Sequence, residues 1–247
     1  MCNLANKINT KQLMENEINE YLDHEVMSLE DWEMLLNNGW DRVGTHFFRR
    51  RYDFYTIPLF QMELKMQLMP LRYDLRSGLH NNLDKNNQFP FSKSQKILKR
   101  RNQNLTCVFQ TARITDEKER LFDDWYDARF QTQSTIFNWV SNGIIPFRTK
   151  EISIYDKDKL IACSFFDQTK HLQYSTTAFF DPNEAKRSLG TYTLMLEIEQ
   201  GIKDKKHFHH PGHAYQITSK YDYKKKIPNA QHFDWDLQLW LPLERLI

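Results

Sequence analysis

The sequence predicts a mixed α/β (α+β) fold in which a mostly antiparallel sheet with flanking helices follows a smaller N-terminal lobe. Three stretches, 151–155, 160–167 and 172–180, alternate apolar and polar residues and are separated by short polar turns, as consecutive antiparallel strands are. Helical patterns with recognisable caps lie on both sides of them. With 247 residues, of which 40% are hydrophobic, the chain is long enough to bury a core.

The segment before the first strong pattern, 1–27, is expected to be a flexible leader. Within it, 9–21 is predicted to form a short surface helix or to fray, because its apolar positions are only loosely periodic. A firmer helix is predicted from Ser28, which supplies an N-cap, to Gly39, which ends it. Its apolar stripe consists of Leu29, Trp32, Leu35 and Leu36.

Strands are predicted next, at 45–48, 52–59 and 59–69. The last of these alternates apolar and polar residues, although its Met, Leu, Glu and Lys content also suits a helix. The following stretch, 78–87, is rich in turn residues and is the best internal break in the chain.

We therefore expect an N-terminal lobe at 28–90 and a second domain at 91–247. Besides the three strands, the second domain is predicted to contain a helix at 92–101, a strand at 105–109, a helix opening at Thr115, a helix at 130–140, a helix at 191–203 and a strand at 207–210. This order of elements suits an acyltransferase fold of the GNAT type. A fold alone does not name a substrate.

Cysteine usage and hydropathy exclude several classes of protein. Cys2, Cys107 and Cys163 lie far apart and form no C-x-x-C pair, which argues against a disulfide framework and against a zinc knuckle. No stretch is long and apolar enough to span a membrane, and the first residues lack the apolar core of a signal peptide. We therefore expect a cytoplasmic protein with reduced thiols and no membrane partner.

The net charge is only +2, but the basic residues are clustered. Three runs stand out, namely 49–51, 93–101 and 224–226. Such patches attract phosphate even when the whole protein is nearly neutral. Each run would also suit a solvent-exposed helix face or turn.

A short motif between the third strand and the following helix has the features of an anion site. In the run KRSLGTY at 186–192, Gly190 permits close approach of the backbone, and a helix beginning near Thr191 leaves free N–H groups at the positive end of its dipole. Arg187 would add a forked, charged donor. Gly190 would equally serve as a simple turn residue, so the motif alone does not identify a ligand.

The same run is part of a longer block, FFDPNEAKRSLGTY at 179–192, which resembles the FFDP…RSLGTY block of arginyl/leucyl-tRNA–protein transferases. Downstream, Gly212, Lys220 and the DYK at 222–224 resemble the family's G…K-M-D-Y-K element, with Tyr221 in the place of the Met. Three spaced elements in the family's order make the resemblance more specific than a glycine motif alone.

The resemblance extends through most of the chain, from about 29 to 233. Asp167 stands at the spacing where the family has a strand-ending Asp. GWDRVG at 39–44 with FFR at 47–49 resembles the family's GWRRFG…FFRP block, and SKSQKILKRRN at 92–102 resembles its PSRSQRRVLRRN block.

The sequence departs from the family in two respects. Typical members carry paired cysteines near the N-terminus and more after the FFRP block, for a metal or iron–sulfur centre, whereas 49–58 here contains no cysteine. Thr177 and His210 replace tyrosines of the family's strands. The sequence therefore does not predict a cluster-dependent or redox-regulated activity, and it leaves open an altered catalytic set.

The resemblance implies a transferase that moves arginine or leucine from aminoacyl-tRNA to the N-terminal amine of a protein or peptide, in the N-degron pathway and without a cofactor. Forming a peptide bond from an ester needs a neutral amine, a group that takes its proton and donors for the oxyanion. The implied catalytic residues are Asp167, which would recognise or deprotonate the amine, Tyr223 and Lys224. The implied residues for the tRNA and its aminoacyl end are Arg187, Gly190, Thr191, Lys220, Lys96, Arg100 and Arg101. Ordinary structural roles remain open, such as core packing for Tyr223, a solvated face for Lys224 and a turn cap for Asp167.

Four histidines lie close together near the end of the second domain, namely His207, His209, His210 and His213. Alternation along a strand would put His207 and His209 on one face and His210 on the other, so we expect no metal site. His210 or His213 would better suit a local acid–base group or a ligand contact.

Two other functions remain open. An acetyl-CoA-dependent GNAT N-acetyltransferase shares the fold, and CoA would then raise its melting temperature. A non-catalytic tRNA-binding or degron-binding relative would account for the missing cysteines, and its RNA binding would be salt-sensitive.

Overall fold

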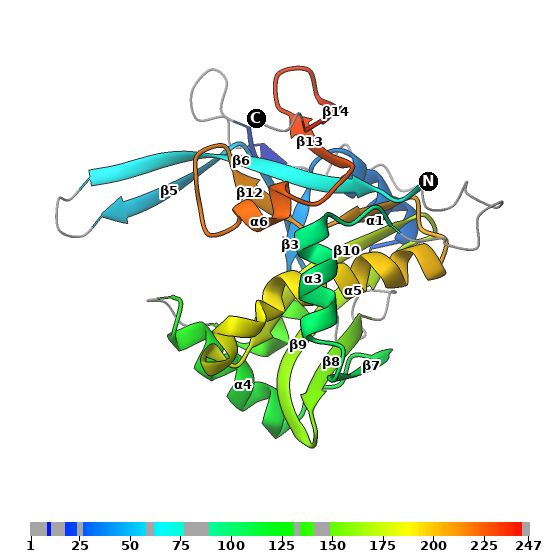
Figure 1. Ribbon diagram of the computed structural model, residues 1–247. Helices are drawn as coiled ribbons and strands as arrows, with labels where there is room; N and C mark the ends of the chain where they lie inside the picture. Colours follow the sequence, from blue (N-terminus) through cyan, green and yellow to red (C-terminus); the bar gives the residue numbers. More distant parts are fainter. Residues whose placement is uncertain are drawn as a thin grey trace.

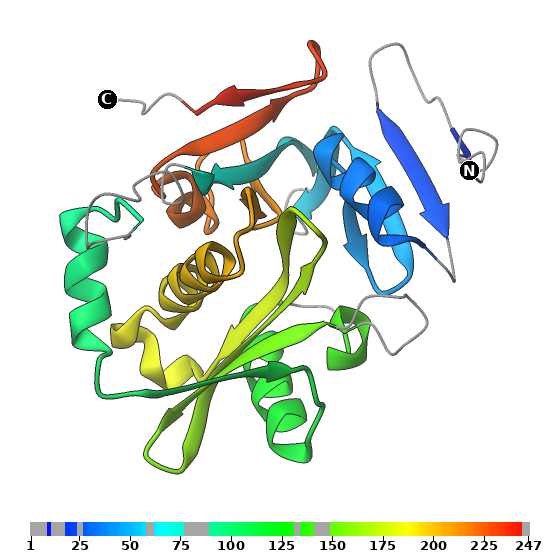
Figure 2. The ribbon, with the colours of Figure 1, turned by 90° about the vertical axis from the view of Figure 1, so that its right-hand side faces the viewer.

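The computed structural model describes residues 9–10, 18–23, 27–57, 62–76, 89–130, 134–140 and 149–243, and Figures 1 and 2 show the chain from two sides. Over these residues the protein is a mixed α+β structure with a mostly antiparallel sheet and flanking helices. The predicted class is confirmed at that level. No helix in these ranges is long and apolar enough to cross a membrane.

Described residues between 9 and 50 form a small sheet packed against one helix, and this sheet with its helix is called the lobe below. Among the described residues its strand order is β1-β2-β4-β3, with β1 (Asn9–Thr10), β2 (Asn19–Asp23), β3 (Asp41–Val43) and β4 (His46–Arg50). Helix α1 (Leu29–Asn37) begins as predicted, because the Ser28 side chain accepts a hydrogen bond of 3.0 Å from Asp31 N. Trp32 and Phe47 meet edge to face in the core of this lobe, with ring centroids 5.1 Å apart.

The prediction of a surface helix within 9–21 is wrong where the structure describes that segment. Strand β2 pairs with β4 along its length, and Leu22 turns into the core, where it is 3% exposed. The pairing partner lies beyond α1 in the chain, so local periodicity gave no sign of it.

The long strand β6 (Met62–Asp74) connects the lobe to a large sheet. It begins as a hairpin with β5 (Tyr52–Ile57), which projects from the body in Figure 1. Over the described residues the sheet has the order β14-β13-β6-β11-β10-β9-β8-β7, and β12 and β5 also pair with β6. The strand predicted at 59–69 is confirmed, and it continues into the centre of the large sheet. The domain boundary at 90 stays a prediction.

The other strands of the large sheet are β7 (Thr106–Thr111), β8 (Lys150–Asp156), β9 (Lys159–Gln168), β10 (Leu172–Phe180), β11 (Phe208–His210), β12 (His213–Tyr215), β13 (Ala230–Asp234) and β14 (Leu239–Pro242). The meander β8-β9-β10 is antiparallel, as predicted, and β10 and β11 are parallel. The helices of this half are α3 (Lys93–Arg101), α4 (Asp116–Asp127), α5 (Leu189–Lys203) and α6 (Asp222–Lys225). Ser92 caps α3 and Thr115 caps α4, as predicted.

Two other expectations were wrong in their extent. The helix predicted at 130–140 appears in 134–140 as the short 3₁₀ helix η2 (Ile136–Trp139), where Ile136 and Val140 pack into the core from a single turn. Helix α5 begins at Leu189 rather than at Thr191, since Ser188 at φ 49° turns the chain into it. The break predicted at 78–87 lies outside the described residues.

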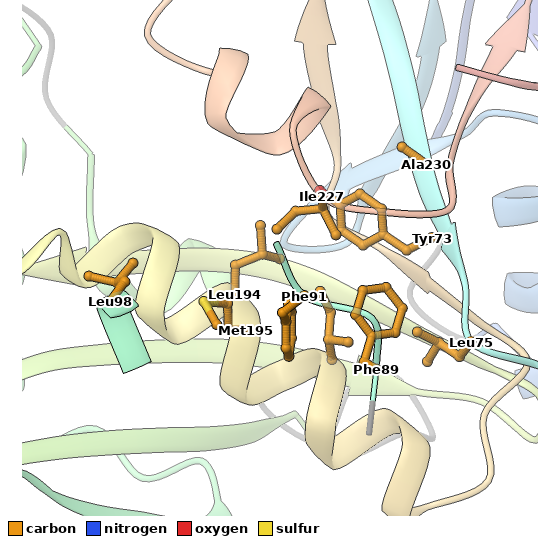
Figure 3. Packing of buried hydrophobic residues seen from close by; sticks show 10 residues of the cluster. Tyr73, Leu75, Phe89, Phe91, Leu98, Leu194, Met195, Ile227 and Ala230 are labelled. Atoms are coloured by element: carbon orange, nitrogen blue, oxygen red, sulfur yellow. The ribbon is translucent and has the colours of Figure 1, made fainter. Parts of the chain in front are cut away.

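Helix α5 lies at the centre of the molecule, against the face of β8, β9 and β10 (Figure 2). Its other side packs on β6 and on residues 89–91. Figure 3 shows this cluster, in which Tyr73 of β6 and the following Leu75, with Phe89 and Phe91, meet Met195 of α5. The helix is therefore held on two sides, and the residues along it are fixed relative to the large sheet.

Gly39→Ala is expected to destabilise the fold by about 2 kcal/mol or more. Gly39 has φ 78°, and a Cβ there would lie 3.0 Å from Cδ1 of the buried Phe233 ring. The matched control is Gly44→Ala, which also has positive φ (60°) but meets its nearest atom at 3.8 Å, so it should cost only about 1 kcal/mol. Urea unfolding of both variants measures the difference, and equal losses would contradict the packing contribution.

Candidate active site

A cleft of about 830 Å³ lies where the N-terminal lobe meets the large sheet. Its walls come from β3 and β4 of the lobe, from β10, from the end of α4 and from the first half of α5. The loop 211–213 and the segment 220–224 complete it. A cleft of this volume is large enough for a small ligand or for the end of a larger one.

The inner wall of the cleft contains a buried carboxylic acid. Glu197 of α5 is 1% exposed, and Ser175 Oγ of β10 donates a hydrogen bond to its Oε2. His209 of β11 approaches the same pair, with Nε2 3.1 Å from Ser175 Oγ and 3.4 Å from Glu197 Oε2. On its other side, His209 Nδ1 lies 3.0 Å from Gln173 Nε2.

Burial sets the protonation of this group. It raises the pKa of Glu197 to about 8, although the hydrogen bond from Ser175 acts in the opposite direction. Burial also lowers the pKa of His209 to about 3, and the charge of Lys224 adds to the effect. At pH 7 the imidazole is therefore neutral, and Glu197 is the group that gains or loses a proton near neutrality.

Lys224 of α6 lines the cleft and is anchored by backbone carbonyls. Its Nζ donates to Pro211 O at 2.7 Å and to His213 O at 3.1 Å. Burial lowers the pKa of Lys224 to about 8, although the charges of Asp41 and Glu197 favour the ammonium form. Lys224 therefore supplies a fixed cation to the cleft at neutral pH.

Two exposed cations line the cleft beside aromatic rings. The Arg129 guanidinium carbon is 4.6 Å from the centroid of the Phe180 ring, and Lys220 Nζ is 4.0 Å from that of Phe130. Burial lowers the pKa of Lys220, and the positive charge of Arg129 lowers it further. The two cations therefore repel each other across the cleft wall. Within the part of the chain that the structure describes, neither forms an ion pair with a carboxylate closer than 4.0 Å. These cations are therefore available to an anionic ligand.

The structure brings half of the predicted site residues together. Those that line the cleft are Gly190, Thr191, Lys220, Tyr223 and Lys224. Burial raises the pKa of Tyr223, so its hydroxyl stays neutral and can donate. Gly190 lies in the first turn of α5, where a Cβ would come within 3.0 Å of Cε1 of Phe180. Its lack of a side chain permits close packing on that ring.

Asp167 does not line the cleft, and it is 1% exposed in β9. Arg42 of β3 binds its Oδ2 through Nε at 2.8 Å and Nη2 at 2.5 Å, and Thr149 donates to Oδ1 at 2.8 Å. Both carboxylate oxygens of Asp167 therefore accept hydrogen bonds. Through them Asp167 fixes the position of Arg42, a residue of the lobe that lines the cleft. This geometry disagrees with direct contact between Asp167 and an acceptor amine, and the turn cap is not observed either.

Arg187 is also outside the cleft lining. Its guanidinium pairs with Asp156 at 2.6 Å and with Glu184 at 2.8 Å, so its charge is already neutralised. Lys96, Arg100 and Arg101 are exposed on α3. This helix lies beside the loop before α5, because Arg101 Nη1 donates to Lys186 O at 2.9 Å.

The four histidines do not converge on one point. His207 is exposed and stacks on His171, with ring centroids 4.9 Å apart. His210 is buried against Trp240, with centroids 5.2 Å apart, whereas His213 lines the cleft and its Nδ1 lies 3.1 Å from Asp41 Oδ2. Among the described residues, no group of three or more His, Cys, Asp or Glu side chains is placed to hold a metal ion.

Arginines, rather than metal ligands, occupy the place of the family's cysteines after the FFR motif. Arg49 lies over the ring of Phe233, with its guanidinium carbon 5.5 Å from the centroid, and Arg51 pairs with Asp236 at 2.6 Å. Guanidinium groups cannot take the place of thiolate ligands. The described residues of this region therefore do not fit a metal or iron–sulfur centre.

Sequence reasoning missed the buried set of Ser175, Gln173, Glu197 and His209 as a unit. One signal was present, since Glu197 is a single charged residue inside the apolar run LMLEI at 194–198. A charge in such a run is rarely buried without a partner. The residues that surround it come from other strands, and their proximity required the fold.

Residues 101–234 match the family described as arginine-tRNA-protein transferase, C terminus. An aspartate/glutamate leucyltransferase of Saccharophagus degradans is 25% identical over 217 residues, covering 83% of this chain and 80% of that protein. One of Hahella chejuensis is 26% identical over 142 residues, covering 56% of this chain and 61% of that protein, so that match spans about three fifths of the relative. Among solved structures, the C-terminal domain of a putative lysylphosphatidylglycerol synthetase from Agrobacterium fabrum aligns with a TM-score of 0.45 and 11% identity, over 59% of this chain and 46% of that one.

Proposed function

This chain belongs to the arginine-tRNA–protein transferase family, and from this premise we propose that it transfers leucine from leucyl-tRNA to proteins with N-terminal aspartate or glutamate. The family was predicted from the sequence, and that prediction is confirmed. The choice of leucine and of acidic acceptors follows the names of the relatives. The observation that carries the proposal is that the matched residues, 101–234, supply most of the lining of the cleft.

In the proposed reaction the acceptor amine attacks the ester carbonyl of the aminoacyl-tRNA. A C–N bond forms, the C–O bond to the ribose breaks, and the tRNA leaves with a free 3′ hydroxyl. Because the ester is already activated, holding the two substrates in contact supplies much of the rate. The cleft volume of about 830 Å³ is in the range that suits an aminoacyl-adenosine.

The donor end would lie along the start of α5. Thr191 and Gly190 face the cleft there, and Lys224 and Tyr223 face it from α6. Lys224 would bind the phosphate or ribose of the 3′ end, and Tyr223 would donate a hydrogen bond or stack on the base. The exposed cations Lys96, Arg100 and Arg101 on α3 would bind acceptor-stem phosphates, which needs no particular base sequence.

The acidic side chain of the acceptor would be bound by Arg129 and Lys220. Both cations line the cleft beside aromatic rings that exclude part of the water around them. A carboxylate between them would form charge-assisted hydrogen bonds, whereas the neutral amide of an N-terminal asparagine would gain less. This assigns to Lys220 the acceptor rather than the tRNA.

Two residues would act at a distance from the substrates. Asp167 would be a positioning residue that fixes Arg42 in the cleft wall. Arg187, with its charge neutralised by Asp156 and Glu184, would stabilise the loop before α5 rather than bind phosphate. The structural roles fit their burial and partners better than a direct catalytic role does.

We also propose that the fold is of the GNAT type, with a transferase domain at 91–247 preceded by a lobe at 28–90. The meander β8-β9-β10, followed by α5 and the parallel strand β11, supports this assignment. A cytoplasmic location and a place in the N-degron pathway accord with a substrate that is aminoacyl-tRNA.

A transfer assay tests the function. Purified protein is given tRNA charged with radiolabelled leucine or arginine, and peptides that begin with Asp, Glu, Asn, Lys or Arg. The expected result is incorporation of leucine into the Asp and Glu peptides. Incorporation of arginine instead would show that the donor is arginyl-tRNA and not leucyl-tRNA. No incorporation with any pair would leave the N-acetyltransferase or a non-catalytic tRNA-binding role, and protection by CoA in a thermal melt would separate those two.

A further inference from the structure

Ser175 and the buried Glu197 lie side by side in the wall of the cleft. Glu197 is 1% exposed, whereas Ser175 is partly exposed. The hydroxyl of Ser175 donates to the carboxylate of Glu197, so the more exposed group of the pair is the serine. A carboxylate in the interior without an ion pair to Lys or Arg is costly to keep ionised, and among the described residues Glu197 has no such pair.

The direction of each hydrogen bond follows from the neighbouring amides. Gln168 Nε2 donates to Gln173 Oε1 at 2.9 Å, which leaves the Gln173 Nε2 group to donate to Glu197 O at 2.8 Å and to His209 Nδ1 at 3.0 Å. His209 Nδ1 is therefore the acceptor, and the proton of the neutral ring is on Nε2. That N–H points at Ser175 Oγ and the carboxylate.

This arrangement fixes the role of the serine. Because His209 Nε2 carries a proton, it cannot act as the base that removes the Ser175 proton. The serine hydroxyl gives its own proton toward Glu197 and keeps a lone pair that faces the cleft. The geometry is that of a proton relay and differs from a Ser–His nucleophile, in which the imidazole would accept.

We propose that Ser175 and Glu197 carry the proton of the acceptor amine during transfer, with His209 holding the pair in register; this inference rests on the proposed aminoacyl transfer. As the amine nitrogen forms its bond to the ester carbonyl carbon, its proton passes to Ser175 Oγ. The Ser175 proton passes at the same time to Glu197 Oε2. When the C–O bond to the ribose breaks, the same path returns the proton to the departing 3′ oxygen. Atoms and charges balance, and the enzyme is unchanged after each cycle.

The protonation of Glu197 suits this task. Its pKa of about 8 is near neutral pH, the range in which a general base combines an available ionised form with sufficient basicity. The titratable groups that face Glu197 from the packed elements are His209 of β11, Lys224 and Tyr223 of α6, Tyr73 of β6 and Cys163 of β9. Of these, Lys224 has a pKa of about 8, close to that of Glu197, and its charge lowers the pKa of the carboxyl.

Steady-state transfer kinetics of Ser175→Ala and Ser175→Thr test the relay. Ser175→Ala should lower kcat about 100-fold or more, with KM for both substrates nearly unchanged. Ser175→Thr keeps the hydroxyl on a strand that tolerates β-branched residues, and it should recover most of the activity. A Ser175→Ala variant with the kcat of the native protein would overturn the proposal.

The pH profile of Glu197→Gln gives a second, independent readout. In the native protein both the amine and Glu197 must lose a proton, so log(kcat/KM) for the acceptor should rise with a slope of about two below pH 7. In Glu197→Gln only the amine titrates, and the slope should fall to about one. An unchanged slope in a folded variant would overturn the proposal.

Binding of a leucyl-adenosine analogue with an amide in place of the ester separates this inference from the proposed function. Native protein that neither binds the analogue nor transfers leucine would reject the function itself. If the native protein transfers leucine and the Ser175 and Glu197 variants bind the analogue normally, a loss of transfer in the variants reports on the relay and not on binding.

Discussion

Asp167→Ala should lower the free energy of unfolding by about 3 to 5 kcal/mol. The change removes the buried carboxylate that pairs with the Arg42 guanidinium, whose side chain is 0% exposed. Arg42 cannot lose its proton to relieve the cost. Urea unfolding measures the loss. The same variant should lose transfer activity even where it is folded, because Arg42 also forms part of the cleft wall.

Two control variants distinguish a buried ion pair from an ordinary one. Lys99→Ala removes an ion pair with Glu199 in which the lysine is 46% exposed, and it should change stability by less than about 1 kcal/mol. The double change Arg42→Met with Asp167→Leu removes both charges and should recover much of the stability lost in Asp167→Ala. If Asp167→Ala were no more harmful than Lys99→Ala, the buried pair would not connect the lobe to the sheet.

Replacing Arg129 and Lys220 together with methionine should lower kcat/KM for Asp and Glu acceptors by about 1,000-fold. Two charge-assisted hydrogen bonds of about 2 kcal/mol each are lost, while methionine keeps the apolar contact with the rings of Phe180 and Phe130. The single changes should each cost about 10 to 100-fold. Competition between peptides that begin with Asp and Asn measures the effect on selectivity.

Lys205→Met, on the exposed turn after α5, is the matched control for loss of one positive charge away from the cleft. It should leave the preference for Asp over Asn unchanged. Binding of the donor analogue should also be unchanged in the double variant. Equal losses for Asp and Asn acceptors would place Arg129 and Lys220 on the tRNA side of the reaction and contradict the assignment to the acceptor.

Local chemistry made several elements predictable. The helices that begin after Ser28, Ser92 and Thr115 were recognisable because each cap is a side chain adjacent to the helix it starts. The meander β8-β9-β10 was predictable because alternation and short turns are local features too. By contrast, β2 and the last residues of β6, Tyr73 and Asp74, pair with strands far along the chain, and no local pattern specifies those partners.

Site residues that belong to a family motif could be predicted from the sequence. Site residues that only long-range packing brings together could not. Tyr223 and Lys224 were named from the sequence and line the cleft. Asp167 was given a direct role because its partner Arg42, 125 positions away, could not be foreseen. Ser175 and Glu197 were missed for the same reason. A serine in a strand and a glutamate in a helix become neighbours only when β10 and α5 pack together.

Transfer is proposed to take place in the cleft between the start of α5 and α6, and photo-cross-linking tests this location directly. The probe is a 3′-leucylamido-adenosine with a photoreactive group on the leucine side chain, and labelled peptides are identified by mass spectrometry. Label is expected within 188–194 or 220–224, and unlabelled leucyl-tRNA should displace it. Displaceable label at the separate cavity of about 690 Å³ near Gln110 and Arg113, with none in the cleft, would contradict it.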